Sequence, residues 1–312
     1  MTRARLAETL RREVKGPVGT DVPLAPLTTY RLGGPAAALV EPRDADDVGA
    51  IGRVLREEDP PVPVLVLGRG SNTLVSDEGW PGLVLRLGSS FSWVLPAEGG
   101  LACGAATSLP VVANWAARRG LSGVEFFVAV PGSVGGAIRM NAGAHGGDVA
   151  ATLRKATIFD LDRLDMTERD AASLNFGYRS SALTDRQVVI DGTFTLESVE
   201  ASAVKAKMDE LRRTRAATQP PAVQNAGSTF KNPPGDHAGR LVEAAGLKGF
   251  RIGGVRVSEK HANFFVAEEG ASAQDVFDLV AEVRRRVRDM HGVELEPEVR
   301  FAGRFHASEV PS

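Results

Sequence analysis

The chain has 312 residues, a hydrophobic share of 43% and a formal net charge of −2. This length predicts two or three domains, and the near-neutral charge gives no sign of a nucleic-acid or anionic-membrane partner. The single cysteine, Cys103, excludes an internal disulfide and a cysteine-cluster metal site, and is typical of a reducing compartment. No apolar run approaches the roughly 20 residues that cross a bilayer, and the charged N-terminus lacks a signal-peptide core. We therefore expect a cytoplasmic protein.

Hydrophobic periodicity predicts a small β-α-β unit in the first part of the chain. Apolar residues recur at helical spacing over residues 4–14, and again from a cap at Asp44 or Asp46 to residue 58. Strands are predicted at residues 37–41, 64–67 and 83–87, and residues 28–34 are predicted to be a strand that ends in a glycine turn.

Short strands and turns dominate the middle of the chain, which indicates a second α+β domain. A helix is predicted at residues 109–119, with strands at 155–161 and 187–196. In the last third, helices are predicted at residues 204–215 and 237–245, with a short strand at 264–266. Ser272, with Asp275 three residues on, is predicted to cap a long helix that runs to residue 290.

Two glycine-rich stretches have the composition of ligand-binding loops. Residues 131–143 read PGSVGGAIRMNAG, and residues 68–73 read GRGSNT after an apolar run. Glycine allows close approach of the backbone to a ligand, and uncovered N–H groups form a nest for phosphate. The second stretch lacks the third glycine and the helix of a dinucleotide fingerprint, and it lacks the lysine of a P-loop. Together they indicate a large cofactor held mainly by loops, although either stretch alone could be an ordinary irregular loop.

Several segments resemble a known family. They are LGRGSNTLVSDEGWPGLVL, PGSVGGAIRMNAGA, FGYRSS, GSTFKNPPGDHAGRLVEAAGLKG, VSEKHANFFV and LEPEVRFAG. With them the chain resembles the family of UDP-N-acetylenolpyruvoylglucosamine reductases (the MurB family), flavoenzymes that complete UDP-N-acetylmuramate in bacterial wall synthesis. The segments follow the family's order from about residue 26 to residue 303, so the resemblance covers nearly the whole chain.

The resemblance implies an α+β fold. Its two-domain FAD-binding unit would be of the vanillyl-alcohol-oxidase or p-cresol-methylhydroxylase type, followed by a C-terminal α+β substrate-binding domain. The expected boundaries are residues 1–87 and 88–199 for the two FAD-binding subdomains, 200–305 for the substrate-binding domain and 306–312 for a tail.

The resemblance also implies the reaction. NADPH would reduce non-covalently bound FAD, which would then reduce the enolpyruvyl ether of UDP-N-acetylglucosamine-enolpyruvate to UDP-N-acetylmuramate. The hydride would pass from flavin N5 to the β-carbon, and a proton would pass from Ser228 to the α-carbon. Such an enzyme serves peptidoglycan synthesis, and with it cell wall biogenesis, cell shape and cell division. We expect a monomer without a nucleic-acid or membrane partner.

Three catalytic positions follow from the resemblance. Ser228 would be the weak acid fixed over the α-carbon. Arg179 would hold the substrate carboxylate, which its planar guanidinium matches, and would meet charge that grows there in the transition state. Glu298 would either orient Ser228 through water or sit protonated against the enolate. Glu294, Glu296 and Glu298 alternate, so in a strand they would share one face. Without the resemblance, these residues would be interpreted as a turn serine, a surface arginine and a solvated acidic face.

Cofactor and substrate contacts are implied in the same way. The predicted FAD-binding residues are Tyr30, Leu67, Gly68, Arg69, Gly70, Ser71, Asn72, Thr73, Pro131, Gly132, Ser133, Gly135, Gly136, Asn141, Ala142 and Gly143. The predicted substrate-binding residues are Tyr178, Lys231, Asn232, Ser258, His261 and Asn263. No metal site is expected, because His261 has no second histidine at ligand spacing.

The chain departs from the family at a few positions. Thr218 stands where members commonly have a lysine near the substrate phosphates, and an arginine of the preceding helix would compensate. His145 replaces a frequent tyrosine, and Ala267 replaces a frequent asparagine. The stretch between Arg179 and Ser228 is too short for the tyrosine-bearing lid of the longer subgroup. We therefore expect the shorter, lid-lacking subgroup, with a more open substrate cleft.

Two other functions are compatible with parts of the sequence. One is a flavin oxidase of the same fold that acts on a different small molecule, for which a covalent flavin link through a histidine or cysteine is common. The other is a non-catalytic nucleotide-binding module, which would carry no flavin or one that NADPH cannot reduce.

Overall fold

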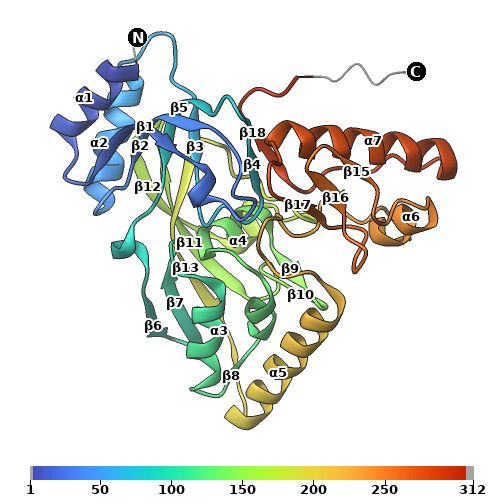
Figure 1. Cartoon of the computed structure of the whole chain (residues 1–312). Coiled ribbons are helices and arrows are strands. Elements are labelled where there is room, and N and C mark those ends of the chain that lie inside the picture. Colours follow the sequence, from blue (N-terminus) through green and yellow to red (C-terminus); the bar gives the residue numbers. More distant parts are fainter. Residues whose placement is uncertain (1–2, 307–312) are drawn as a thin grey trace. The chain divides into compact units, whose positions relative to one another are not determined.

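The computed structural model describes residues 3–306, which fall into two compact units (Figure 1). The first unit contains residues 3–22, Ala37–Arg69 and Gly82–Arg215, and the second contains Pro23–Ala36, Gly70–Pro81 and residues 216–306. Helices and strands surround an apolar core in each unit, so the predicted α+β composition is confirmed. Among the described residues, no helix is both long and apolar enough to span a bilayer.

A four-stranded sheet with two helices forms one part of the first unit. Its strands run in the order β1 (Val18–Pro23), β2 (Pro35–Val40), β5 (Trp80–Leu85) and β3 (Val64–Val66). The helices α1 (Arg3–Glu13) and α2 (Ala45–Arg56) pack on each other beside it (Figure 1). Of the two predicted caps of α2, Asp44 is the right one, because its side chain accepts a 2.9 Å hydrogen bond from the N–H of Asp47.

A five-stranded antiparallel sheet forms the other part of the first unit. Its order is β12 (Asp165–Asp170), β11 (Leu153–Asp160), β13 (Gln187–Thr195), β7 (Gly100–Gly104) and β6 (Val94–Ala97). Helices α3 (Leu109–Ala117) and α4 (Val134–Met140) contribute to the core of this part. Sequence periodicity predicted β11 and β13 but missed β12, since that edge strand is polar apart from the exposed Met166 and buries no side chain fully.

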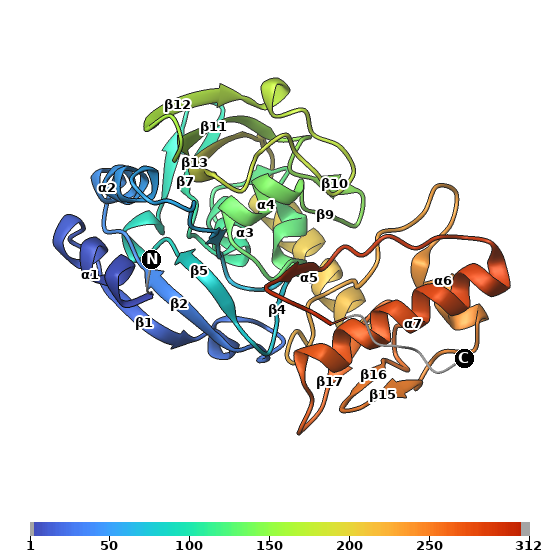
Figure 2. The ribbon, with the colours of Figure 1, turned by 90° about the horizontal axis from the view of Figure 1, so that it is seen from above.

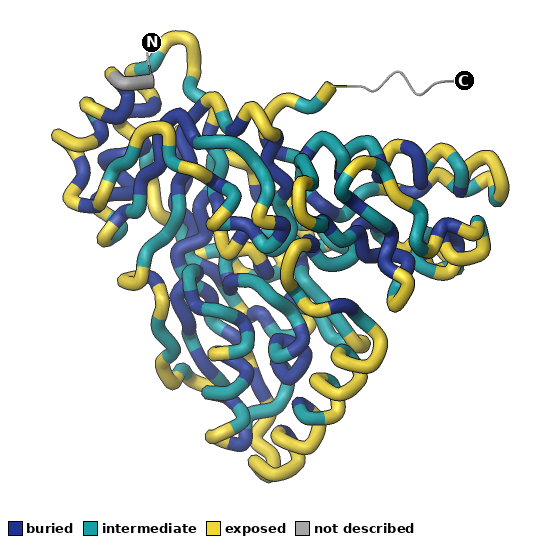
Figure 3. Tube along the Cα trace, viewed as in Figure 1, coloured by how far each residue is buried: buried dark blue, intermediate teal, exposed yellow. Residues whose placement is uncertain are grey.

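Two pairs of very short strands and one long helix complete this region. The antiparallel pairs are β8 (Leu121–Ser122) with β14 (Glu197–Ser198) and β9 (Gly143–Ala144) with β10 (Gly147–Asp148). Helix α5 (Ala201–Thr218) buries only Val204 and Met208, and most of its residues are exposed (Figure 3). It ends before Pro220, as predicted.

The second unit is built around α7 (Ala273–His291). The antiparallel strands β15 (Arg251–Ile252), β16 (Val255–Val257) and β17 (Phe265–Ala267) lie along this helix (Figure 2), together with α6 (Ala238–Ala244). Strand β18 (Arg300–Ala302) pairs in parallel with β4 (Thr73–Val75). The predicted cap of α7 is confirmed as a full capping box, because Ser272 and Asp275 exchange two 3.0 Å hydrogen bonds.

Three sequence expectations about local structure are wrong. The stretch 131–143 is not a continuous loop, because α4 forms inside it and buries Val134 and Ile138. Residues 28–34 form no strand. Glu294, Glu296 and Glu298 lie outside any strand, because β18 begins only at Arg300. Pro297, which lies among them, nevertheless forms an isolated bridge with Phe230. The glycines of the stretch 131–143 argued against a helix in the sequence. The helix α4 is only two turns long, and it is stabilised by the burial of its apolar side chains in the core.

Candidate functional site

The two glycine-rich stretches touch in the first unit. A Cβ atom at Gly68 would lie 2.6 Å from Oγ of Ser133, and one at Gly135 would lie 3.0 Å from Cβ of Ala105. Neither approach leaves room for a side chain without a shift of the neighbour. The structure therefore brings Gly68 and Ser133, predicted from separate motifs, into direct contact.

The backbone of residues 68–72 has the uncovered donors expected of a phosphate nest. None of these five N–H groups donates a hydrogen bond to another residue between 3 and 306. Gly70 has a φ of 61°, and a Cβ atom there would lie 2.3 Å from the carbonyl oxygen of Leu27, so only glycine fits. A run of amide donors of this kind fits the diphosphate of FAD.

Asn141 ends α4 and links the second glycine-rich stretch to the turn that bears Arg179. It adopts a left-handed conformation with φ of 42° and is buried. Its Nδ2 donates to the carbonyl of Gly177 at 3.0 Å, and its Oδ1 accepts from the N–H of Ala150 at 2.9 Å. The side chain of this predicted cofactor residue is thus engaged within the protein.

The remaining predicted cofactor residues on these stretches are mostly accessible. Leu67 is buried. Exposed or partly exposed are Arg69, Ser71, Asn72, Thr73, Pro131, Gly132, Gly136, Ala142 and Gly143.

Arg179 lies on a tight turn in the first unit, where Gly177 and Ser180 form an isolated antiparallel bridge. Its φ of 54° is unusual for a residue other than glycine and re-aims the side chain. The guanidinium Nη2 donates to the carbonyl of Gly143 at 2.6 Å. The neighbouring Tyr178 is exposed, and its ring centroid lies 5.1 Å from the Arg179 guanidinium carbon. Arg179 is therefore held at the end of the glycine-rich stretch.

In the second unit, the segment that follows Ser228 pairs with the segment that carries Glu298. The residue after Ser228, Thr229, accepts a 2.8 Å hydrogen bond from the N–H of Glu298 through its carbonyl. Phe230 forms an isolated antiparallel bridge with Pro297. These two contacts pair the segment that follows Ser228 with the segment that carries Glu298, although the two lie far apart in the sequence.

Asn263 holds the other side of the same segment. This side chain is 2% exposed; its Oδ1 accepts from the N–H of Phe230 at 2.9 Å, and its Nδ2 donates to the carbonyl of Phe230 at 2.8 Å. The carbonyl of Asn263 also accepts from the N–H of Thr229 at 2.8 Å. An amide used in this way imitates a neighbouring strand. Thr229 and Phe230 therefore lie between Asn263 and the Glu298 segment.

Lys231 and Asn232 continue the serine segment toward α6. The Lys231 Nζ lies 2.5 Å from Oε1 of Glu296, and its backbone N–H donates to the Glu296 carbonyl at 2.9 Å. The Oδ1 of Asn232 accepts from the N–H of Ala238, the first residue of α6. Sequence analysis gave Glu296 no role, although the alternation of acids around it was a visible signal.

Ser258 and His261 form a local turn. The buried Ser258 hydroxyl accepts from the N–H of Lys260 at 3.2 Å and, at 3.4 Å, from that of His261. The ring Nδ1 of His261 accepts from the N–H of Asn263 at 3.2 Å. Burial lowers the pKa of His261, and the nearby Lys248 lowers it further, so the imidazole is neutral at pH 7.

Tyr30 is buried in the core of the second unit beside Thr229. Burial raises the pKa of Tyr30, which keeps the phenol protonated. The Thr229 hydroxyl faces the Tyr30 phenol and partly offsets the effect of burial on its pKa. Within residues 3–306, no group of three or more potential metal-ligating side chains occurs.

Comparisons with known proteins agree with this arrangement. A family model described as an FAD binding domain matches residues 36–162, and one for the C-terminal domain of UDP-N-acetylenolpyruvoylglucosamine reductase matches residues 219–302. The reductase of Sphingopyxis alaskensis is 42% identical over 93% of this chain and 96% of its own. Reductase 2 of Symbiobacterium thermophilum is 44% identical over 96% of this chain and 97% of its own.

A solved structure gives the same result. The crystal structure of the corresponding reductase (MurB) from Thermus caldophilus superimposes with a TM-score of 0.78 at 35% identity, and covers 93% of this chain and 99% of its own. The expected fold class, an FAD-binding unit followed by a C-terminal α+β domain, is confirmed.

Proposed function

The chain belongs to the family of UDP-N-acetylenolpyruvoylglucosamine reductases. From this premise, we propose the role of each site residue in the reaction. The enzyme uses FAD and NADPH to reduce UDP-N-acetylglucosamine-enolpyruvate to UDP-N-acetylmuramate, a step of peptidoglycan precursor synthesis. The flavin oxidase and the non-catalytic module are not favoured, because relatives of this function match along nearly the full chain.

The glycine-rich stretches hold the cofactor. Bound FAD supplies the hydride chemistry that amino-acid side chains lack. The N–H groups of residues 68–72 bind its diphosphate, and the contact between Gly68 and Ser133 keeps the two stretches close enough to act together. FAD is bound without a covalent link, and NADPH is the reductant.

Arg179 binds the substrate carboxylate. Its Nη2 is held by the carbonyl of Gly143 at 2.6 Å, which orients the guanidinium before substrate arrives. A preplaced cation of this kind stabilises the negative charge that develops when the double bond is reduced. The cation also orients the enolpyruvyl group through two parallel hydrogen bonds.

Ser228 donates the proton to the α-carbon, and Glu298 assists it. The paired backbones of Thr229 and Glu298 support this assignment, because they hold both catalytic segments on one short frame. Glu298 either orients the Ser228 hydroxyl through water or stays protonated toward the enolate. In both cases, a fixed donor next to a strongly basic carbon is what proton transfer needs.

The substrate nucleotide is bound by polar residues of the second unit together with Tyr178. Lys231 contributes positive charge, and Asn232, Ser258 and His261 contribute hydrogen bonds. Asn263 contributes by holding the segment beside Ser228, since both atoms of its amide bond to Phe230.

Anaerobic titration of the purified, flavin-loaded protein tests this function. NADPH should bleach the flavin absorbance, and addition of UDP-N-acetylglucosamine-enolpyruvate should restore it with formation of UDP-N-acetylmuramate. The backbone pairing of the Ser228 and Glu298 segments carries the proposal. A flavin that stays bleached after substrate addition contradicts it.

The cellular setting is part of the same proposal. The enzyme acts in the cytoplasm as a monomer, without a membrane partner, and serves cell shape and division through the cell wall. Residues 1–87 and 88–199 bind FAD, and residues 200–305 bind the substrate. Of the expected tail, 306–312, all but the first residue lie outside the described residues. The matched family models support the order of these parts.

A further inference from the structure

The turn at Thr29 connects two predicted parts of the site in the second unit. Its N–H donates to the carbonyl of Gly70 at 3.0 Å, which ties it to the glycine-rich stretch. Its hydroxyl donates to the carbonyl of Asn225 at 2.6 Å, a bond across 196 residues of chain. Its own carbonyl accepts from the N–H of Gln224 at 2.8 Å. Thr29 therefore bonds on one side to the predicted cofactor stretch and on the other to the segment that leads to Ser228.

Asn225 shapes the approach to Ser228. The side chain is 1% exposed; Nδ2 donates to the carbonyl of Pro221 at 2.7 Å, and Oδ1 accepts from the N–H of Gly227 at 3.3 Å. Gly227 follows with a φ of 77° and turns the chain. Through these contacts, the Asn225 carbonyl held by Thr29 lies only three residues before the Ser228 hydroxyl.

Ser228 lies between two fixed points. Before it, Thr29 holds Gln224 and Asn225. After it, Asn263 and Glu298 hold Thr229. Two bonds link the segment before Ser228 to Thr29, which also bonds Gly70: the Thr29 carbonyl accepts from Gln224, and the Thr29 hydroxyl donates to Asn225. On the other side of Ser228, Asn72 of the glycine-rich stretch donates to the carbonyl of Glu298. Of the two Thr29 bonds, the one to Asn225 depends on the side chain, so a substitution can remove it alone.

We propose that Thr29 is a positioning residue that sets the Ser228 hydroxyl relative to the cofactor stretch. This role rests on the proposed function, because that function makes Ser228 the proton donor. Loss of the Thr29 hydroxyl shifts Asn225 and with it Ser228, while Thr29 keeps its backbone bonds to Gly70 and Gln224. Proton delivery then suffers, and hydride transfer from NADPH to flavin does not.

The test compares three variants in separate half-reactions. Thr29→Val removes the hydroxyl at nearly constant volume, Thr29→Ser keeps it, and Thr28→Val is the matched control. Thr28 lies in the same turn, and its hydroxyl donates only locally, at 3.2 Å to the carbonyl of Ala25 and at 3.4 Å to that of Leu32.

Stopped-flow absorbance should show flavin reduction by NADPH at the wild-type rate in all three variants. Reoxidation by the enolpyruvyl nucleotide should slow about fivefold in Thr29→Val, which corresponds to one hydrogen bond of ordinary net strength. Thr29→Ser should stay within about twofold of wild type, and Thr28→Val should match wild type. If Thr29→Val loses its flavin, Thr29→Ala replaces it, because it also lacks the hydroxyl.

Two outcomes overturn the inference. One is equal reoxidation rates in Thr29→Val and Thr28→Val, which makes the Thr29 hydroxyl a stabilising contact only. The other is a slowed Thr29→Ser, which means that the hydroxyl is not what matters. Failure of the proposed function has a different signature, because there the wild-type flavin itself is not reoxidised by the nucleotide.

Discussion

Around Gly68 and Ser133 in the first unit, the predicted site is formed by close-packed backbone, whereas around Ser228 in the second unit it is formed by side chains on segments that are paired through their backbones. Gly68 meets Ser133 so closely that a single methyl group would collide. Ser228 and Glu298 instead sit on segments that Thr229, Asn263 and Glu298 bind to one another. In the proposed function, the first arrangement gives shape and backbone donors to a large cofactor, and the second gives a fixed proton donor.

Replacement of Ser228 is the most direct test of this comparison, and we expect it to have the largest effect. Ser228→Ala should leave flavin reduction by NADPH unchanged and slow reoxidation by substrate about a thousandfold, because only the second half-reaction needs the proton. Rapid-mixing absorbance measures both. Ser173→Ala, an exposed surface hydroxyl in the first unit, is the control and should change neither rate. Fast reoxidation in Ser228→Ala would assign the proton to another group.

Replacement of Arg179 tests whether a cation in the first unit binds the substrate carboxylate. Arg179→Met should lower kcat/KM for the enolpyruvyl nucleotide about a hundredfold, since a hydrogen-bonded charge pair contributes roughly 1.5–3 kcal/mol. Arg179→Lys should fall between Met and wild type, because it keeps charge without the planar fork. Arg154→Met, which removes an exposed arginine 4.0 Å from Glu98, should have no effect in steady-state assays. Equal losses for Met and Lys would point to a packing role.

Gly68 tests the contact between the glycine-rich stretches. Gly68→Ala should weaken FAD binding about tenfold, because the new Cβ lies 2.6 Å from the Ser133 hydroxyl and overpacking costs about 1–3 kcal/mol. Adding Ser133→Ala should restore most of the affinity, since the Ser133 Cβ is at an ordinary 3.8 Å. Gly88→Ala, with only the Pro42 carbonyl at 3.7 Å, is the control. Fluorescence titration of the apoprotein with FAD measures all three.

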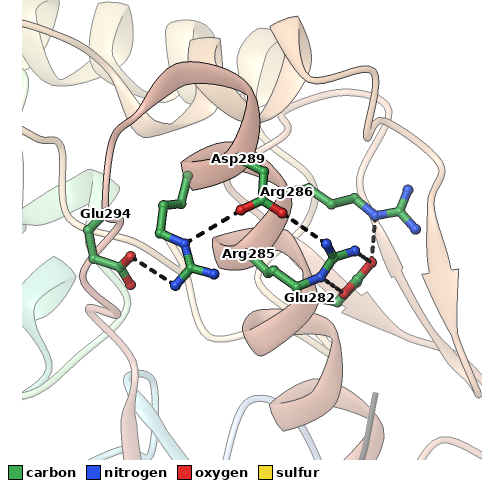
Figure 4. A network of polar contacts seen from close by, with 6 residues as sticks. Glu282, Arg285, Arg286, Asp289 and Glu294 are labelled. Carbon is green, nitrogen blue, oxygen red and sulfur yellow. Dashed lines mark hydrogen bonds and ion pairs between the residues drawn. The ribbon is translucent and has the colours of Figure 1, made fainter. Parts of the chain in front are cut away.

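The smallest expected effect concerns stability of the second unit alone. On α7, the nearly buried Glu282 accepts hydrogen bonds from Arg285 and Arg286 at 2.6–2.9 Å, in a network that extends to Asp289 and Glu294 (Figure 4). Glu282→Gln should lower the free energy of unfolding by about 1 kcal/mol without changing either half-reaction. Glu294→Gln, at a half-exposed site, should cost less.

The pH dependence of this effect has a defined sign. The hydrogen bond from Arg285 lowers the pKa of Glu282 against the opposing effect of burial, with help from Arg286. A carboxyl group with a depressed folded-state pKa stabilises the protein above its unfolded pKa of about 4.3, and this stabilisation is lost as pH falls through the folded value. Chemical denaturation at several pH values should therefore show the difference between wild type and Glu282→Gln vanish in acid. A constant difference would contradict the ion-pair origin.

Local signals in the sequence were enough for most helices. The capping box of α7 and the cap of α2 depend on residues three positions apart. The first was predicted, and for the second Asp44 was one of two predicted caps. The polar edge strand β12 and the short helix α4 were missed, because their stability comes from neighbours in space and not from their own pattern. The site motifs were predicted from resemblance, whereas the internal use of the Asn263 and Asn141 amides was not.

By itself, the sequence determined the family, the cofactor chemistry and the local elements, because motifs, caps and amphipathic periods act over a few residues. The tertiary structure alone decided which distant residues meet. Thr29 reaches Asn225 across 196 residues, and the Asn72 amide reaches the Glu298 carbonyl across 226, while Pro23–Ala36 and Gly70–Pro81 join the second unit. Such contacts follow from burial and chain closure over the whole fold, and no short stretch of residues encodes them.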